Sequence, residues 1–167
     1  MTAASPRQAR RYDSPLRAQR AAETKATLVR VATDLFVTNG WAATGMRDVA
    51  RAAGVAVETL YSHYPSKRAL LDAVVDEAAA GDNAPVAVAE RPEFRAMGRG
   101  RRADRIAAAA AVATAINART APLARIVRDA AVGDPEIAAV LRATRERQRA
   151  DVATGVGLLL GRPASDA

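Results

Sequence analysis

The stretch that decides the fold runs from Thr44 to Lys67 and reads TGMRDVARAAGVAVETLYSHYPSK. Its first part repeats apolar residues every three or four positions, which places them on one face of a helix: Met46, Val49, Ala50 and Ala53. Thr44 stands where an N-cap residue is expected, because its hydroxyl could accept a free backbone N–H. Gly54 follows the last apolar position, where helices often end at positive φ. We therefore predict a short helix between Thr44 and Gly54.

A second short helix is expected from about Val57 to Tyr64, because Pro65 cannot continue it and Ser66 can cap the helix that follows. Two short helices joined by a glycine-containing turn form the helix-turn-helix unit. Its second helix fits the major groove of B-DNA, which is about 12 Å wide. Leu60 is expected to point inward. The residues expected to point outward are Ala56, Val57, Glu58, Thr59, Tyr61, Ser62 and His63.

The outward residues offer several kinds of DNA contact. Glu58 could accept a hydrogen bond from cytosine N4, and Thr59 could contact a thymine methyl group or a phosphate. Tyr61 and His63 could form hydrogen bonds with phosphates. His63 is the only histidine and the chain has no cysteine, so a metal site is not expected. We expect no cofactor.

Four segments occur in a familiar order: FVTNGW, TGMRDVARAAGV, TLYSHYPSK and RALLDAV. Between roughly Glu23 and Val75 the chain resembles the TetR family of transcriptional regulators. The resemblance implies a DNA-binding domain, a helical regulatory domain, a homodimer and a palindromic double-stranded DNA operator. It also implies a small-molecule effector that releases the operator. The residues implied to face DNA are Thr44, Arg47, the outward residues from Ala56 to His63, and Lys67.

Two basic residues of this region are candidates for direct contact with DNA. Arg47 lies on the side of the first helix expected to face outward, so it could reach guanine or a phosphate; the alternative is a surface arginine paired with Asp48. Lys67 lies in the first turn of the helix predicted from Ser66 to about Ala80, where a positive charge opposes the helix dipole. A DNA phosphate nearby would compensate for this misfit. Trp41 is expected to pack under the helix-turn-helix.

Composition indicates an all-α protein that carries net positive charge. Half of the 167 residues are apolar, 4% are aromatic, and no alternating β-branched runs occur. The net charge of +7, from 25 basic and 18 acidic residues, suits a nucleic-acid partner but is also common without one. No signal peptide pattern opens the chain, and a cytoplasmic location is expected. The uncharged run from Ile106 to Ala118 is shorter than the roughly 20 residues that span a bilayer, so no membrane association is expected.

We predict four segments. They are a basic, disordered tail over 1–22, a helix-turn-helix domain over 23–69, a short ligand-binding and dimerisation domain over 70–160, and a C-terminal tail over 161–167. Pro6 and Pro15 are expected to prevent a helix in the tail, so that the first helix runs from Glu23 to Asn39. The tail could be an arm on DNA or a solvated terminus. Its arginines are Arg7, Arg10, Arg11, Arg17 and Arg20.

The second half is expected to hold further helices. Residues 97–102 read as a flexible basic loop. An alanine-rich helix is predicted from Ala103 to about Thr120, ending before Pro122 and buried on nearly all sides. Two more helices are predicted over 123–132 and from Glu136 towards Thr154. Near the end of the alanine-rich helix, Asn117 and Arg119 could orient a ligand, cap carbonyls or face solvent.

The favoured function is sequence-specific transcriptional regulation, with repression as the expected mode. The alternative is a protein-interaction or ligand-sensing module with weakened DNA binding. It is motivated by Gly45 and Ala56, which replace the residues usual in the family, and by the short C-terminal part. An enzyme is not expected, because the sequence has no nucleophile elbow, metal cluster or paired carboxylates at a glycine-rich loop.

Overall fold

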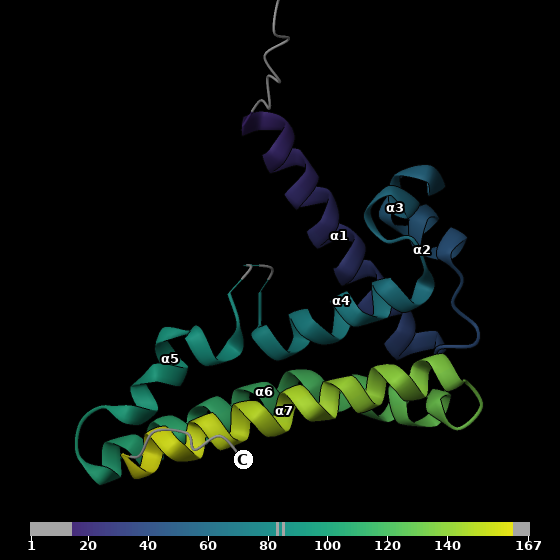
Figure 1. Cartoon of the computed structure of the whole chain (residues 1–167). Coiled ribbons are helices and arrows are strands. Elements are labelled where there is room, and N and C mark those ends of the chain that lie inside the picture. The colour runs from purple at the N-terminus through teal and green to yellow at the C-terminus, as the bar shows by residue number, and fades with distance from the viewer. Residues whose placement is uncertain (1–14, 83, 85, 162–167) are drawn as a thin grey trace, which may run out of the picture.

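The computed structural model describes residues 15–82, 84 and 86–161. These residues are helical and contain no strand, which confirms the all-α prediction. Helix α1 packs against both α2 and α4, α3 packs against α2, and α4 lies between this N-terminal group and a long antiparallel pair, α6 and α7 (Figure 1). The elements are α1 (Pro15–Asn39), α2 (Met46–Ala53), α3 (Val57–His63), α4 (Lys67–Ala80), η1 (Val88–Glu90), α5 (Pro92–Arg95), η2 (Ala96–Gly98), α6 (Arg102–Ala131) and α7 (Pro135–Leu160).

Helix α1 begins at Pro15, eight residues before the predicted start at Glu23. Proline is tolerated in a first helical turn, where its missing N–H would have no partner, and the alanine- and arginine-rich residues after it favour a helix. The prediction of an unstructured tail over 1–22 is therefore wrong for residues 15–22. Arg17 and Arg20 are exposed on α1, whereas Arg7, Arg10 and Arg11 lie outside the described residues.

One hydrophobic core joins the two halves of the described chain. Leu28 and Phe36 of α1 are fully buried, as are Leu60 of α3 and Leu70 of α4. The same cluster includes residues of the long helix pair. Those residues, all buried, are Leu123, Val127, Ile137 and Val140.

Helix α6 continues through Pro122, although two separate helices were predicted here. Proline has no N–H to donate to the carbonyl of Ala118, four residues earlier. Both residues are exposed, so water can hydrogen-bond to that carbonyl. Helix α6 packs against α4 and α7; Arg119, before Pro122, donates to a carbonyl of α4, and Leu123, directly after it, is buried. Packing has therefore outweighed a local helix-breaking signal.

The N-terminal half of α6 is exposed, and the prediction that it is buried on nearly all sides is wrong. Ile106 is 49% exposed, and the buried residues of α6 are Leu123 and Val127, both beyond Pro122. Within the described residues, α6 is also the one helix long and apolar enough to cross a membrane, by length and composition alone. This leaves part of the apolar surface of α6 uncovered by the elements that the structure describes.

Helix α7 begins at a well-formed cap and extends further than predicted. The Asp134 carboxylate accepts hydrogen bonds from the N–H groups of Glu136 and Ile137, at 2.9 and 3.3 Å. The helix continues past Thr154 to Leu160. Gly155 is buried there, and a Cβ atom at this position would lie 3.3 Å from Cε of Met97. Met97 is itself buried in η2, so the predicted flexible loop over 97–102 is wrong at its start.

Candidate DNA-binding surface and effector cavity

Helices α2 and α3 form the predicted helix-turn-helix. Gly54 ends α2 with φ +69°, and the N–H of Val55 donates to the carbonyl of Ala50 at 3.0 Å. The positive φ turns the chain sharply enough for α3 to begin three residues later. At the start of α2, the N–H of Gly45 donates to the Asp48 carboxylate at 3.0 Å. The N-cap of α2 is thus Gly45, held by a side chain from within the helix.

Thr44 does not cap α2, so that prediction is wrong. Its hydroxyl donates to the carbonyls of Leu35 and Gly40, at 3.2 and 3.0 Å. Only 1% of the residue is exposed. Thr44 therefore ties the loop to the end of α1 and has no surface to offer to DNA, which removes it from the predicted contacts.

Helix α3 presents most of its predicted outward residues. Ala56, Glu58, Tyr61 and Ser62 are exposed, and Thr59 and His63 are half-buried. Leu60 is completely buried, as predicted. Val57 differs from the prediction in part, because it is half-buried and packs against the core. The exposed side of α3 is therefore Glu58, Tyr61 and Ser62, flanked by the half-buried polar residues.

Arg47 is exposed on α2 and makes no ion pair among the described residues. Asp48, the partner that could have held it, instead accepts a hydrogen bond from Arg51 at 2.6 Å. The alternative interpretation of Arg47 as half of a local ion pair with Asp48 therefore fails. Its guanidinium is left available to an external acceptor.

Lys67 has an intramolecular partner that the sequence did not predict. Its ammonium donates to the backbone carbonyl of Trp41 and lies 4.0 Å from the centre of the Trp41 ring. Burial lowers the pKa of Lys67, against a smaller opposing effect of the Asp134 carboxylate. Trp41 also contacts Phe36, with the ring centres 5.4 Å apart. The positive charge at the start of α4 is thus compensated by the carbonyl and the indole ring, so it does not require a phosphate.

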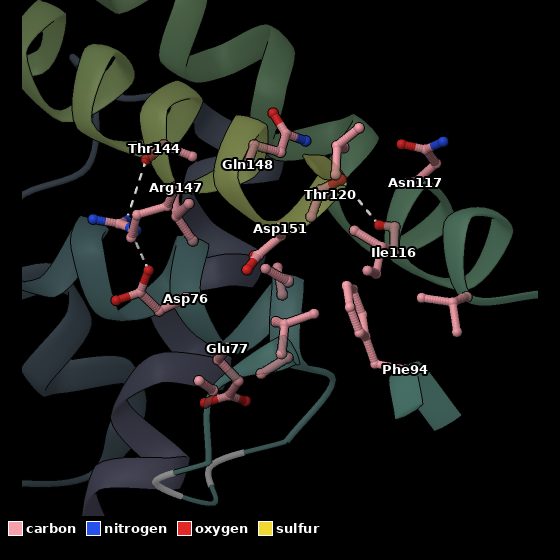
Figure 2. A pocket seen from close by; sticks show the side chains of 18 of the residues that line it. Asp76, Glu77, Phe94, Ile116, Asn117, Thr120, Thr144, Arg147, Gln148 and Asp151 are labelled. Atoms are coloured by element: carbon pink, nitrogen blue, oxygen red, sulfur yellow. Dashed lines mark hydrogen bonds and ion pairs between the residues drawn. The ribbon is translucent and has the colours of Figure 1, made fainter. Parts of the chain in front are cut away.

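The C-terminal half of α4 lines a cavity of about 1330 Å³. Residues of α1, α4, α6, α7 and the segment between α4 and α6 surround it. The lining is mainly apolar and rich in alanine and valine, with Phe94 at one side (Figure 2). Polar side chains that reach the lining include Asp76, Glu77, Asn117, Thr120, Gln148 and Asp151.

Two carboxylates of this lining have raised pKa values because burial disfavours their charged forms. Burial raises the pKa of Glu77, and the nearby charge of Asp82 adds to the effect. Burial also raises the pKa of Asp151, against the opposing charge of Arg147. Tyr64, which lines the cavity as well, has its pKa raised by burial and by Glu77. Desolvated carboxylates in an apolar cavity are typical of a functional site.

Two arginines fix the end of α4. Arg119 of α6 donates from Nε to the carbonyl of Ala78 and from Nη2 to that of Ala79, at 2.9 and 3.1 Å. Capping of carbonyls was one of the roles predicted for Arg119. The carbonyls that it caps belong to α4 and not to its own helix, α6. Arg91 forms a two-pronged pair with Asp82 at 2.6 and 2.8 Å. These hydrogen bonds lower the pKa of Asp82 to about 2.

The helix-turn-helix region matches a known family. Residues 28–74 match the model of the bacterial regulatory proteins of the tetR family. This part of the chain, about a quarter of its length, is similar to the DNA-binding part of that family. A comparison with curated proteins found no match.

The TetR-family match ends within α4, so it does not reach α6 and α7. This agrees with the region in which the motifs were read from the sequence. A ligand-binding domain was predicted over 70–160, but most residues that line the cavity were not, because its walls come from helices far apart in the chain. Asn117 was the one candidate named beforehand that lines it, and Asp151 gave no signal because it lies in a run of charged residues on α7.

Proposed function

We propose that the chain is a DNA-binding transcriptional regulator of the TetR family, and that it is a repressor that leaves a palindromic operator when a small molecule fills the cavity. The observation that carries the proposal is the position of α4. Its first residue, Lys67, contacts Trp41 beside the helix-turn-helix, and its last turns form a wall of the cavity. An α-helix transmits displacement along its axis, and these 14 residues span about 21 Å. A ligand that moves one end of α4 would therefore move α3.

We propose DNA contacts for the side chains of α2 and α3 according to how exposed each one is. Glu58 and Tyr61 lie on the open side of α3, with Thr59 and Ser62 beside them, where a major-groove helix presents its side chains. Arg47 would contact a phosphate or guanine from α2. Ala56, Val57 and His63 would contribute van der Waals or phosphate contacts at the edges of this surface. We assign Lys67 to supporting α4 rather than to a direct phosphate contact.

Homodimer formation is typical of the family, and we propose that α6 and α7 supply the interface. Ile106 is 49% exposed on α6, and Val152, Val156 and Leu160 are 62, 48 and 59% exposed on α7. Exposed apolar residues on two neighbouring helices are typical of an association surface. Two copies joined through a two-fold axis would present two recognition helices to successive major-groove sites. We expect this regulator to act in the cytoplasm.

Selection of bound duplexes from a random DNA library, with the purified full chain at moderate salt, tests the proposal. An enriched inverted repeat would support a dimeric sequence reader and would identify its operator. Retention without an enriched motif would contradict sequence-specific reading. No retention would favour the interaction-module alternative, for which the absence of a side-chain cap at Ala56 on α3 is the supporting observation.

A further inference from the structure

The first turns of α1 are not covered by any other described element. All eight residues from Leu16 to Glu23 are exposed, and the first buried residue of α1 is Leu28. At 1.5 Å per residue, about 18 Å of helix separates Leu16 from Leu28. This part of α1 rises with α2 and α3 on the side of α4 that is away from α6 and α7 (Figure 1). Residues 16–23, the α1 extension, therefore project from the same side of the chain as the helix-turn-helix.

Local helix propensity, rather than packing, accounts for the α1 extension. Its sequence is LRAQRAAE, and every residue type in it belongs to the strongest helix formers. Nε2 of Gln19 also donates to the carboxylate of Glu23, one turn later, at 3.0 Å. Because the extension continues a packed helix, it avoids the cost of nucleating a new one. The sequence thus holds a helical arm in solvent without burying an apolar face.

The α1 extension carries two positive charges on one face. Arg17 and Arg20 are three positions apart, so they are neighbours on the helix surface. Arg17 lies eleven positions before buried Leu28, and Arg20 lies eleven before buried Val31, which is close to three full turns in each case. Both arginines therefore continue the face of α1 that packs into the core. Within the described part of the chain, neither side chain forms an ion pair or a hydrogen bond.

Duplex DNA is the partner that fits this charge and this position. Each strand carries a phosphate about every 3.4 Å, and a guanidinium can donate two parallel hydrogen bonds to one phosphate. The sequence before the extension, residues 1–14, adds three arginines and one aspartate, which suits the same partner. A protein partner would favour apolar anchors, but Leu16 is the one large apolar residue among residues 16–23.

We propose that the α1 extension is a second DNA contact, in which Arg17 and Arg20 bind phosphates of the duplex next to the base pairs that α3 contacts. The inference rests on the proposed DNA-binding function and adds a surface outside the helix-turn-helix. Phosphate contacts carry no sequence information directly. The extension therefore strengthens and orients binding without changing which operator is chosen.

The salt dependence of binding to the random duplex pool, before any selection, tests this inference. Each phosphate contact contributes about 0.9 to the slope of log affinity against log salt concentration. We expect Arg17→Gln/Arg20→Gln to reduce this slope by about 2 for each bound chain, and Arg17→Lys/Arg20→Lys to retain it. Arg99→Gln/Arg102→Gln is the matched control, because it removes two exposed arginines that are also three positions apart and lie between η2 and α6. The control should leave the slope unchanged.

Single cysteines give a second, positional test, since the chain has none of its own. Iron–EDTA attached at Leu16→Cys should cleave the bound duplex, whereas the same reagent at Arg99→Cys should not. Absence of cleavage from Leu16→Cys would overturn the inference.

An unchanged slope in Arg17→Gln/Arg20→Gln would also overturn the inference and would leave the extension to a protein partner. An equal decrease in the control would reduce the effect to general attraction between the chain and DNA, which contradicts a contact at α1. Neither measurement uses a selected motif, so a failed operator selection would leave the α1 contact standing, and a failed α1 contact would leave the operator standing. Failure of the unaltered chain to bind any duplex would overturn both.

Discussion

Lys67 lies with its ammonium 4.0 Å from the centre of the Trp41 ring and donates to the backbone carbonyl of the same residue. This contact joins the first turn of α4 to the loop after α1, directly beside the helix-turn-helix. Because Trp41 is the only tryptophan of the chain, its fluorescence reports on this joint.

We expect Lys67→Met to change Trp41 emission and to lower the free energy of unfolding by about 1 kcal/mol, through loss of the cation–π contact and hydrogen bond. The dependence of DNA affinity on salt should stay as it is in the unaltered chain. Urea unfolding and fluorescence anisotropy across a salt series measure both quantities. A salt slope reduced by about 1 with unchanged stability would instead make Lys67 a phosphate contact.

Of the two contacts proposed for Arg47, a phosphate contact predicts that Arg47→Ala weakens binding to all DNA sequences to a similar extent and reduces the salt slope by about 1. Anisotropy titrations on operator and random duplexes measure this. Arg99→Ala is the control, since Arg99 is also exposed but follows η2, on the far side of the chain. Loss of affinity for one base sequence alone would place Arg47 at a guanine.

Glu58→Ala should alter which operator bases are preferred, costing about 1–3 kcal/mol at the base pair that it reads. Repeating the library selection with the variant reveals the change. Glu90→Ala provides a comparison, because Glu90 is exposed in η1, away from α3. If Glu58→Ala weakened binding to all sequences equally and the same motif were selected, Glu58 would not read a base.

Ile106→Glu should weaken the proposed dimer by about tenfold or more, because a charge would be placed in an apolar interface. Sedimentation velocity over a range of concentrations follows the change. Val132→Glu is the matched control: Val132 is 91% exposed at the turn between α6 and α7. Equal sedimentation of Ile106→Glu and the unaltered chain would remove this face of α6 from the interface.

The Arg91–Asp82 pair should make the end of α4 sensitive to acid. The folded pKa of Asp82 is lowered to about 2 from its usual 3.8, mainly by hydrogen bonds from Arg91. A lowered pKa stabilises the fold above the unfolded value, and this contribution is lost as the pH falls from about 4 towards 2. Asp82→Asn should therefore lower the urea midpoint at pH 7, and the difference should shrink near pH 2. If the urea midpoints of Asp82→Asn and the unaltered chain differed by the same amount at every pH, the Arg91–Asp82 pair would not have this role.

The helix-turn-helix could be predicted from sequence because its signals are local. Gly54, Pro65 and Ser66 mark the helix ends through their own backbone and side-chain chemistry, and the structure confirms all three boundaries to within a residue or two. Thr44 could not be predicted in the same way. A threonine before a helix suits an N-cap, and only the position of α1 shows that its hydroxyl has nearer acceptors at Leu35 and Gly40.

The second half of the chain was harder to predict because its helix boundaries and buried residues depend on packing between distant segments. Pro122 is locally a helix-ending signal, yet α6 continues through it and packs against α4 and α7. Alanine-rich periodicity suggested burial, but among residues 15–82, 84 and 86–161 no helix covers the N-terminal half of α6 on all sides. Glu77 and Asp151 lie more than seventy positions apart along the printed sequence, so no spacing rule joins them into one cavity.

The continuous core described above has a consequence for how the protein unfolds. Leu28 and Phe36 of the DNA-binding part belong to the same buried cluster as Leu123 and Ile137 of the long helix pair. The predicted boundary at residue 69 therefore does not separate two cooperative units, and heating should give one transition for both halves. Any compound held in the cavity would then protect the recognition helix from melting, so that a thermal shift reports binding throughout the chain.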